Sequence, residues 1–267
     1  MNNIIERKVN IDKDFDLENY LDSIHLPKKV SSELINKGLV KVEKDKVLFD
    51  LAEYDKNDIE PVDIPIDIVY EDSDIVVIKK GRGILIHSDG NTNDTLLNAL
   101  SFYLLNKGYK LKPRSVHRID YDTIGLVLFS KNIISYYHLF YQMEQEMIKK
   151  KYYLVVGGLL NSGVIEKPIG KNRHKNNCYI VTKSGKRAKT VYEKLDYKDN
   201  KTLLVATITT GRTHQIRVHM AYLNHPIIGD KIYGSGDKLM LESFYLGFLS
   251  PINNKYLEIK IDNELEF

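Results

Sequence analysis

The sequence predicts a protein that contains both strands and helices, in an order that is compatible with an α+β fold. Short apolar runs, such as 125–129 and 203–209, are typical of buried strands. Other segments, such as 94–106 and 132–147, carry apolar residues at helical spacing. The apolar fraction of 43% and the charged fraction of 28% are those of an ordinary globular protein. A length of 267 residues suits one large domain, or a small domain followed by a larger one.

Several classes of protein do not fit the composition. The sequence has no apolar run near 18 residues, so no membrane-spanning helix is expected. The first fifteen residues lack the basic and then apolar pattern of a secretion signal. A single cysteine, Cys178, can form neither an internal disulfide nor a thiolate metal site. These features predict a cytoplasmic protein that has no contact with a membrane.

Charge is distributed unevenly along the chain. Residues 1–75 contain 10 Lys and Arg against 19 Asp and Glu, a balance of −9. Subtraction from the totals of 39 and 36 leaves 29 against 17 in residues 76–267, a balance of +12. The asymmetry suggests two regions, of which the second is able to meet phosphate groups.

The N-terminal part has the pattern of a small separate unit. Apolar residues from Leu17 to Ile24 fall at helical spacing, and a second helix is predicted from Ser31 to Lys37, ending at Gly38. Two strands at 39–42 and 47–49 form a predicted hairpin. A proline-containing linker, 60–65, follows. We therefore expect two domains, residues 1–60 and 61–267.

The larger region alternates further strands and helices. Asn132 is placed to cap one helix and Thr213 another, while Gly108 is placed to end a third. The predicted elements are, in order, two strands within 68–79 around an acidic turn, a helix over 94–106, a strand at 125–129, a helix from 132 to about 147, a strand entered at Tyr152, a strand at 203–209, a helix from Thr213 to Leu223 and a closing strand at 256–261.

The most informative stretch is 115–131, SVHRIDYDTIGLVLFSK. It places His117, Arg118 and Asp120 directly before a buried strand. A carboxylate at such a place can be a nucleophile, a general base or the partner in a structural ion pair. Spacing alone leaves these three roles open.

A second stretch is strongly basic. Residues 167–189 contain eight Lys or Arg and no acidic residue. Such a run within a domain favours phosphate contact over a merely solvated face. The residues expected to contact backbone phosphates are Lys171, Arg173, Lys186, Arg187 and Lys189.

Three histidines near the predicted last helix raise the question of a metal site. His214 and His219 are five residues apart and diverge on a helix, and His225 follows it. No acidic or thiolate third ligand accompanies them. No metal is expected here.

Three segments together resemble the signatures of the RluA-type pseudouridine synthase family. They are HRIDYDTIGLVLFSK from His117, KKYYLVVGG from Lys150 and GRTHQIRVHMAYLNHPIIGDKIYG from Gly211. The chain departs from the family pattern at Ile124 in place of Ser, Gly81 in place of Pro and Asn224 in place of Gly. The two helices and hairpin near the N-terminus also resemble, in a degenerate form, the small RNA-binding module first known in a ribosomal protein. A plain packing domain is the alternative for that unit.

The resemblance implies an α+β pseudouridine synthase fold with a mixed, mostly antiparallel sheet and flanking helices. It implies conversion of uridine to pseudouridine within structured RNA, ribosomal or transfer RNA, without a cofactor or metal. Asp120 is then the nucleophile or base, Arg217 its ion-pair partner and Tyr152 the ring that stacks on the uracil; a one-residue change of strand register gives that role to Tyr153. Arg118 fills the space left by the flipped nucleotide or holds its phosphate. The other expected substrate-binding residues are His117, Thr123, Arg212, His214 and Gln215.

Two other functions remain compatible with the sequence. One is an inactive RNA-binding or ribosome-assembly factor on the same scaffold, which Ile124 and the acidic N-terminal unit favour. The other is a hydrolase in which His117 assists Asp120. We expect a monomer in each case.

Overall fold

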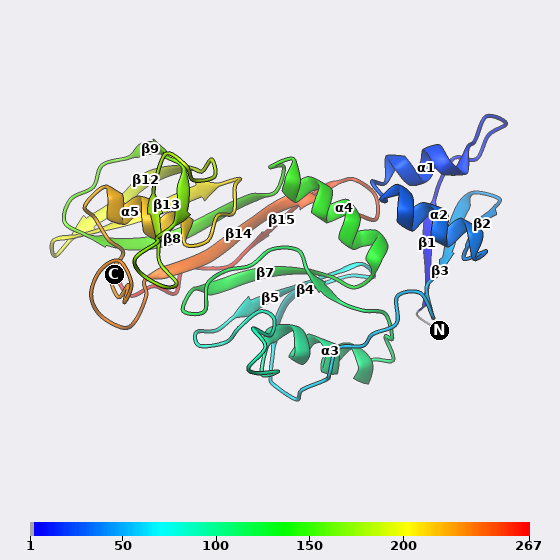
Figure 1. Ribbon diagram of the computed structural model, residues 1–267, viewed down its shortest axis with the longest axis horizontal. Coiled ribbons are helices and arrows are strands. Elements are labelled where there is room, and N and C mark those ends of the chain that lie inside the picture. The colour runs from blue at the N-terminus through cyan, green and yellow to red at the C-terminus, as the bar shows by residue number, and fades with distance from the viewer. Residues whose placement is uncertain (1–2) are drawn as a thin grey trace.

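The computed structural model describes residues 3–267. Its centre is a ten-stranded sheet that runs across most of the molecule, while a smaller unit formed by the N-terminal residues lies at one end (Figure 1). Along the sheet the strands follow the order β4-β5-β7-β14-β8-β13-β12-β9, with β15 beside β14 and β6 beside β7. The strands are β4 (Asp67–Glu71), β5 (Ile75–Lys80), β6 (Arg114–Ser115), β7 (Ile124–Ser130), β8 (Lys149–Gly157), β9 (Gly163–Glu166), β12 (Lys189–Lys198), β13 (Lys201–Ile208), β14 (Leu241–Leu249) and β15 (Tyr256–Lys260).

The sheet is mixed and mostly antiparallel, as predicted. Its one parallel pairing among the described strands joins β7 to β14, with Gly125 opposite Ser243. Gly125 has φ +105°, and a Cβ atom at this position would lie 2.1 Å from the carbonyl oxygen of Ser243. Only glycine permits so close an approach of the two backbones. This seam joins the β4-β5-β7 half of the sheet to the β14-β8-β13-β12-β9 half.

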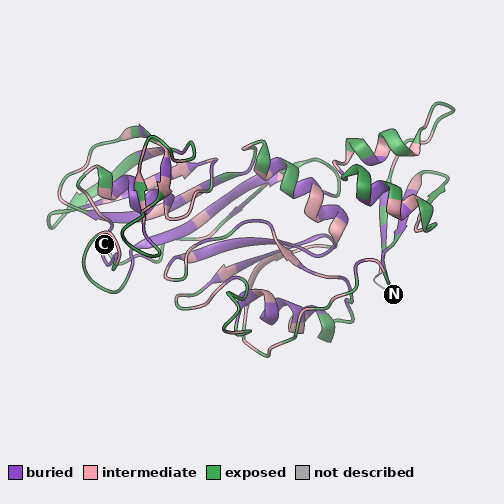
Figure 2. Ribbon diagram, in the orientation of Figure 1, coloured by how far each residue is buried: buried purple, intermediate pink, exposed green. Residues whose placement is uncertain are grey.

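Helices cover both faces of the first half. Leu100 and Leu104 of α3 (Leu96–Asn106) belong to the same core cluster as Val76 and Val127. On the other face, Leu139 of α4 (Ile133–Glu144) belongs to a second cluster with the alternate residues of β5 and β7. Figure 2 shows β5 and β7 as mostly buried. Alternate side chains of a strand point to opposite faces of the sheet, and here a helix covers each face. None of the helices in residues 3–267 has the length and hydrophobicity that crossing a bilayer requires.

Helix ends follow the predicted signals in α3 and α4. Asn132 accepts a hydrogen bond from the Ser135 backbone N–H and so caps α4, which ends three residues earlier than predicted. Gly108, with φ +77°, follows the last turn of α3. Helix α5 (Gln215–Tyr222) was predicted, but its predicted cap was wrong, because the residue before the helix is His214 rather than Thr213 and its side chain makes no capping hydrogen bond.

The N-terminal unit has its own three-stranded sheet, in the order β1-β3-β2, and two short helices. Both helices and the hairpin were predicted, although the second helix begins three residues earlier, at Lys28. Strand β1 was not predicted. Leu21, Leu34, Val47 and Phe49 are fully buried and form its core. The elements are β1 (Ile4–Lys8), α1 (Leu17–Ser23), α2 (Lys28–Asn36), β2 (Val40–Glu43) and β3 (Lys46–Asp50).

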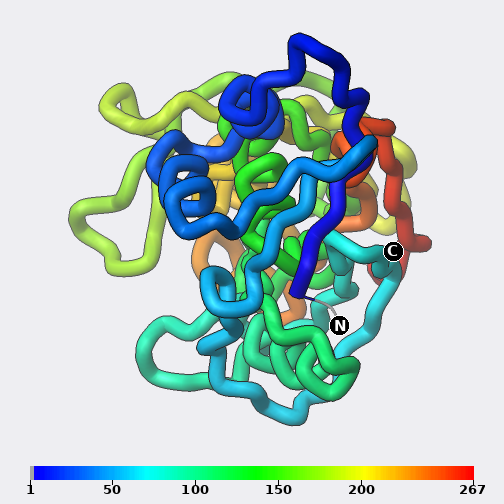
Figure 3. The backbone as a smooth tube through the Cα atoms, turned by 90° about the vertical axis from the view of Figure 1, so that its right-hand side faces the viewer, coloured from blue at the N-terminus to red at the C-terminus, as the bar shows by residue number. Residues whose placement is uncertain are grey.

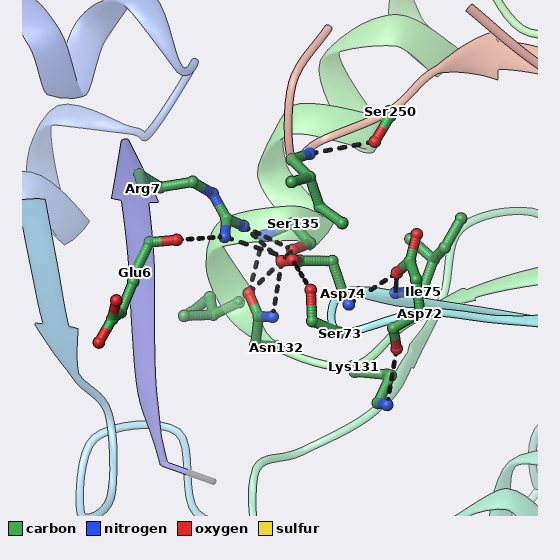
Figure 4. A network of polar contacts seen from close by, with 12 residues as sticks. Glu6, Arg7, Asp72, Ser73, Asp74, Ile75, Lys131, Asn132, Ser135 and Ser250 are labelled. Atoms are coloured by element: carbon green, nitrogen blue, oxygen red, sulfur yellow. Dashed lines mark hydrogen bonds and ion pairs between the residues drawn. The ribbon is translucent and has the colours of Figure 1, made fainter. Parts of the chain in front are cut away.

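A buried polar network joins this unit to the large sheet (Figure 4). The guanidinium of Arg7, on β1, forms an ion pair with Asp74, immediately before β5. Asp74 also accepts hydrogen bonds from Ser73 at 2.8 Å, from Asn132 at 3.1 Å and from Ser135. Because Asn132 is the cap of α4, the network fixes β1, β5 and the start of α4 to one another.

The basic segment 167–189 lies at the end of the large sheet opposite to the N-terminal unit. The hairpin of β10 (Ile169–Lys171) and β11 (Tyr179–Val181) forms a separate two-stranded sheet. Loops in this part of the chain project from the outline of the molecule when it is viewed along its long axis (Figure 3, yellow-green).

Candidate active site

Asp120 lies in the loop between β6 and β7, at the seam of the sheet. Its side chain is 19% exposed, and its Oδ2 accepts a 2.9 Å hydrogen bond from Nη1 of Arg217. The backbone N–H of Thr123 donates to the carbonyl of Asp120 at 3.1 Å, which tightens the turn that leads into β7. The predicted pair is therefore present, and it joins the loop before β7 to helix α5, which contacts β12 in the other half of the sheet.

Arg217 is held from its other side by Asp230. Its Nε and Nη2 donate to the two carboxylate oxygens of Asp230, each at 2.8 Å. The backbone N–H groups of Ile232 and Tyr233 also donate to Asp230, so this buried carboxylate is well satisfied. Although burial acts in the opposite direction, the hydrogen bonds from Arg217 lower the pKa of Asp230. The bidentate pair fixes the plane of the guanidinium and leaves Nη1 directed at Asp120.

The start of α5 is organised by Gln215. Its Oε1 accepts from the Thr210 hydroxyl at 2.8 Å and from the Arg212 backbone N–H at 3.1 Å. Its Nε2 donates to the Lys189 carbonyl at 2.9 Å. Gln215 lines the pocket, but its amide is used by the fold and holds the loop that carries Arg212.

Tyr152 and Tyr153 point to opposite faces of β8. Tyr152 is buried and lines the pocket beside Asp120. Burial raises its pKa, so the phenol is neutral at ordinary pH. Tyr153 instead stacks on Phe244, with ring centroids 3.8 Å apart. The register therefore places Tyr152, rather than Tyr153, at the site.

The pocket around these residues has a volume of about 160 Å³. His117, Thr123, Arg212 and His214 lie in its wall, and Arg118 lies on its exposed rim. The remaining lining residues are Ile119, Met143, Lys150, Ile208, Gly211, Thr213, Ile216 and Leu241, besides Asp120, Tyr152, Gln215 and Arg217.

The two histidines of the pocket differ in their relation to Asp120. His117 is buried, and its Nε2 accepts a hydrogen bond from the Leu128 backbone N–H at 3.1 Å. Burial lowers the pKa of His117 to about 3, so the ring is neutral. It is His214 that approaches the carboxylate, with Nε2 3.9 Å from Asp120 Oδ2. The pairing of Asp120 with His117 that a hydrolase requires is absent from the ion pairs and hydrogen bonds of residues 3–267.

The predicted RNA-backbone residues do not line the pocket. All five are exposed, on the β10–β11 hairpin (Lys171 and Arg173), on the loop that follows it (Lys186 and Arg187) and at the first residue of β12 (Lys189). Glu166 lies 3.4 Å from the Arg187 guanidinium and 3.8 Å from the Lys189 ammonium. The others form no ion pair within the part of the chain that the structure describes.

The sequence did not single out two charged residues of the site. Asp230 lies inside the matching segment 211–234, but no pattern links it to Arg217. Lys150 stands two residues before Tyr152 and shares its face of β8. Strand alternation could have identified Lys150, but a lysine in the run Lys149-Lys150-Lys151 looks like a surface residue.

No group of three or more His, Cys, Asp or Glu residues within 3–267 is arranged to hold a metal ion. His219 is engaged by the fold, because its ring nitrogens contact the Thr190 hydroxyl at 2.9 Å and the Lys167 carbonyl at 3.0 Å.

Comparison with known proteins gives the family of this fold and site. The model of the RNA pseudouridylate synthase family matches residues 74–222, more than half of the chain, including Asp120, Tyr152 and Arg217. The chain belongs to the RNA pseudouridine synthase family. This pseudouridine synthase is 35% identical over 260 residues to an RNA pseudouridine synthase of Aquifex aeolicus, covering 89% of this chain and 82% of the other. It is also 35% identical to the ribosomal large subunit pseudouridine synthase D of Vibrio cholerae, covering 89% and 78% of the two chains.

The fold of this pseudouridine synthase is similar to that of a solved family structure. Human RNA pseudouridylate synthase domain containing 1 superposes with a TM-score of 0.63 at 23% identity, covering 74% of this chain and 83% of the other. This likeness confirms the predicted pseudouridine synthase fold, while the resemblance of the N-terminal unit to an RNA-binding module stays a prediction. Membership of the family shows that the protein is an RNA-modifying isomerase, and nothing in the site favours an inactive scaffold.

Proposed function

We propose that this enzyme isomerises a uridine of large-subunit ribosomal RNA and that Asp120 starts the reaction. Three relatives named ribosomal large subunit pseudouridine synthase D, 35%, 41% and 38% identical to this chain, support the substrate class. The observation that carries the catalytic role is the carboxylate of Asp120, held at 2.9 Å by an arginine that Asp230 fixes in turn. It is the carboxylate of the pocket that remains open to a ligand.

The reaction detaches uracil from C1′ of ribose, turns the base and rejoins it through C5. In this proposal the Asp120 carboxylate acts as nucleophile at C1′ or as base on the ribose, while Arg217 keeps it oriented. Tyr152 stacks on the uracil, and its neutral ring contributes the flat apolar surface that this requires. His117, Thr123, Arg212 and His214 shape the wall around the base. The overall change conserves every atom and electron, so no cofactor is consumed.

Reaching the uridine requires the nucleotide to leave the RNA stack. Base flipping costs a few kcal/mol, which contacts outside the pocket must offset. Arg118, exposed on the rim, is placed to occupy the vacated position. The exposed residues Lys171, Arg173, Lys186, Arg187 and Lys189 supply positive charge for the RNA backbone.

We further propose a division into an N-terminal domain, residues 1–60, and a catalytic domain, residues 61–267. The separate three-stranded sheet with its own core supports this division. The acidic balance of residues 1–75 supports a role in packing and positioning more than in gripping RNA.

The proposal is tested by mapping pseudouridine in total RNA from cells that lack the gene. The gene is then restored as wild type or as Asp120→Asn, with Asp122→Asn as a matched control in the same loop. We expect one or a few sites in large-subunit RNA to disappear on deletion and to return with wild type and the control only. Sites confined to transfer RNA would replace the substrate assignment, and full restoration by Asp120→Asn would overturn the role of Asp120.

A further inference from the structure

Lys150 is a buried charged residue that forms no ion pair with any of the residues that the structure describes. It lies on β8, two residues before Tyr152 and on the same face, and only 2% of its surface is exposed. Successive residues on one face of a strand are about 6 to 7 Å apart. Lys150 therefore lines the same pocket as Tyr152, together with Ile208, its partner on the neighbouring strand β13.

The ammonium group is incompletely satisfied by the protein. Its Nζ donates to the Thr209 carbonyl at 3.3 Å and lies 3.7 Å from the sulfur of Met143. No carboxylate forms an ion pair with it among residues 3–267. A buried ammonium has three donors and normally finds an acceptor for each of them.

Lys80 shows what a structural buried lysine looks like in this protein. It is buried to a similar degree, at 1% exposed, but it donates to three backbone carbonyls: those of Gly81 at 2.8 Å, Tyr121 at 2.9 Å and Ile84 at 3.2 Å. Lys80 needs nothing more. Lys150 has one comparable acceptor and faces a pocket that a ligand enters.

Burial, assisted by the charge of Arg212 and opposed by that of Glu146, lowers the pKa of Lys150 to about 8. The group thus keeps most of its positive charge near neutral pH, in a pocket wall that also contains the apolar side chains of Met143, Ile208 and Leu241. Such surroundings strengthen the interaction of a charge with any anion that forms beside it.

The proposed reaction creates an anion in this pocket. When the bond between C1′ and N1 breaks, its electron pair leaves with the base, and negative charge spreads over N1 and the two carbonyl oxygens of the uracil. The charge disappears when C5 bonds to C1′, and at this step the bond from C1′ to the Asp120 carboxylate breaks or, if Asp120 acted as a base, the ribose regains its proton. C5 then loses its proton and N1 gains one. We propose that Lys150 is a further catalytic residue, whose ammonium stabilises the uracil anion between these two steps. This inference rests on the proposed role of Asp120 in starting glycosidic cleavage.

A backbone phosphate is a weaker candidate for the anion. The phosphates of a flipped nucleotide stay with the RNA strand at the mouth of the pocket, where the exposed Arg118 lies. Lys150, being buried, is placed to meet the base instead.

The test uses single-turnover kinetics on an RNA that contains the mapped uridine, transcribed with either UTP or 5-fluoro-UTP. The variants are Lys150→Met and Lys150→Gln, with the exposed neighbour Lys149→Met as the matched control. The signal is loss of the target uridine or 5-fluorouridine, measured by nucleoside mass spectrometry. RNA affinity and thermal unfolding are measured in parallel.

We expect both neutral variants to lower the rate about 10²- to 10³-fold on uridine, the usual effect of removing one electrostatic stabiliser. RNA affinity should change by no more than about threefold, and Lys149→Met should behave as wild type. Because fluorine at C5 stabilises the departing anion by itself, the loss on 5-fluorouridine should be at least about tenfold smaller.

A structural role predicts the same loss on both substrates, and that result would overturn the proposal, as would wild-type rates in either neutral variant. Lys150→Gln keeps the test open if Lys150→Met does not fold. Activity of Asp120→Asn in the same assay would instead overturn the role of Asp120, so the two failures are distinguishable.

Discussion

Asp230 holds Arg217 through two hydrogen bonds of 2.8 Å and so determines where the third guanidinium nitrogen meets Asp120. Replacement by Asn removes one acceptor and the charge while keeping the size. We predict that Asp230→Asn lowers the single-turnover rate about 10²-fold, because a displacement of about 1 Å in the reacting groups can cost that much. The exposed Asp237→Asn is the control. An unchanged rate would show that Arg217 does not depend on Asp230 for its position.

The two tyrosines of β8 should separate cleanly by function. Tyr152→Leu removes the ring that lines the pocket, and stacking on a base contributes about 1 to 3 kcal/mol, so we expect a rate loss of about 10- to 100-fold. Tyr153→Leu removes the stack on Phe244 and should reduce the free energy of unfolding by about 1 kcal/mol. Its rate should stay within about threefold of wild type. The reverse outcome would mean that Tyr153 contacts the base.

The ion pair between Arg7 and Asp74 should dominate the attachment of the N-terminal unit. The exposed fractions of the two side chains are 7% and 1%. Arg7→Met leaves a buried carboxylate without its cation, which typically costs about 3 to 5 kcal/mol. We predict a lower free energy of unfolding and faster hydrogen exchange in β1. Lys8→Met, at an exposed position of the same strand, is the control, and equal exchange in both variants would contradict the prediction.

Gly125 should not tolerate a side chain. A Cβ atom would lie 2.1 Å from the Ser243 carbonyl oxygen, and the positive φ of +105° adds strain. We predict that Gly125→Ala lowers the free energy of unfolding by about 3 kcal/mol and reduces activity by opening the seam beside Asp120. Gly81 has nothing within 4 Å of the corresponding position, so Gly81→Ala should be neutral or slightly stabilising. The free energy of unfolding of both variants is measured by urea titration.

His138 should make stability depend on pH. It is buried on α4, near His25 of the N-terminal unit, and burial lowers its pKa to about 4. Below pH 6.5, His138 therefore binds a proton in the unfolded chain but stays neutral in the folded chain. The contribution of neutral His138 to the free energy of unfolding is fully present above pH 6.5. It is lost as the pH falls from 6.5 towards 4 and amounts to about 3 kcal/mol.

The prediction is checked by urea unfolding at several pH values between 4 and 7. His138→Leu should show a shallower pH dependence than wild type, while the exposed His174→Leu should not differ from it. Parallel curves for wild type and His138→Leu would rule out His138 as the source.

The sequence was most informative where chemistry imposes a local pattern. Asp120, Tyr152 and Arg217 stand in three recognisable segments, and the structure brings all three into one pocket. Asn132 and Gly108 were identified as helix ends because capping depends on nearby backbone groups. His214 could not be identified in this way, since Thr213 has the side chain that normally caps a helix.

Residues whose role depends on distant partners were missed for a physical reason. Strand β1 has the sequence IIERK, in which a buried position is occupied by Arg7. An arginine there looks like a surface residue until Asp74, 67 residues later, is seen beside it. Lys150 was missed in the same way. The pairing of β7 with β14 could not be predicted from nearby residues either, because Gly125 alone does not show which backbone approaches it.

The seam also delays folding of the catalytic part during synthesis of the chain. Gly125 and Ser243 are 118 residues apart in the chain. Asp120 and Arg217 lie on opposite sides of the β7–β14 seam, so they meet only after the seam has formed. A ribosome adds about 5 to 20 residues per second, so β7 waits about 6 to 24 s for its partner to be synthesised. The N-terminal unit can fold during that interval, but the active site cannot assemble on an incomplete chain. An enzyme of this architecture begins to modify RNA only after nearly all of it has been made.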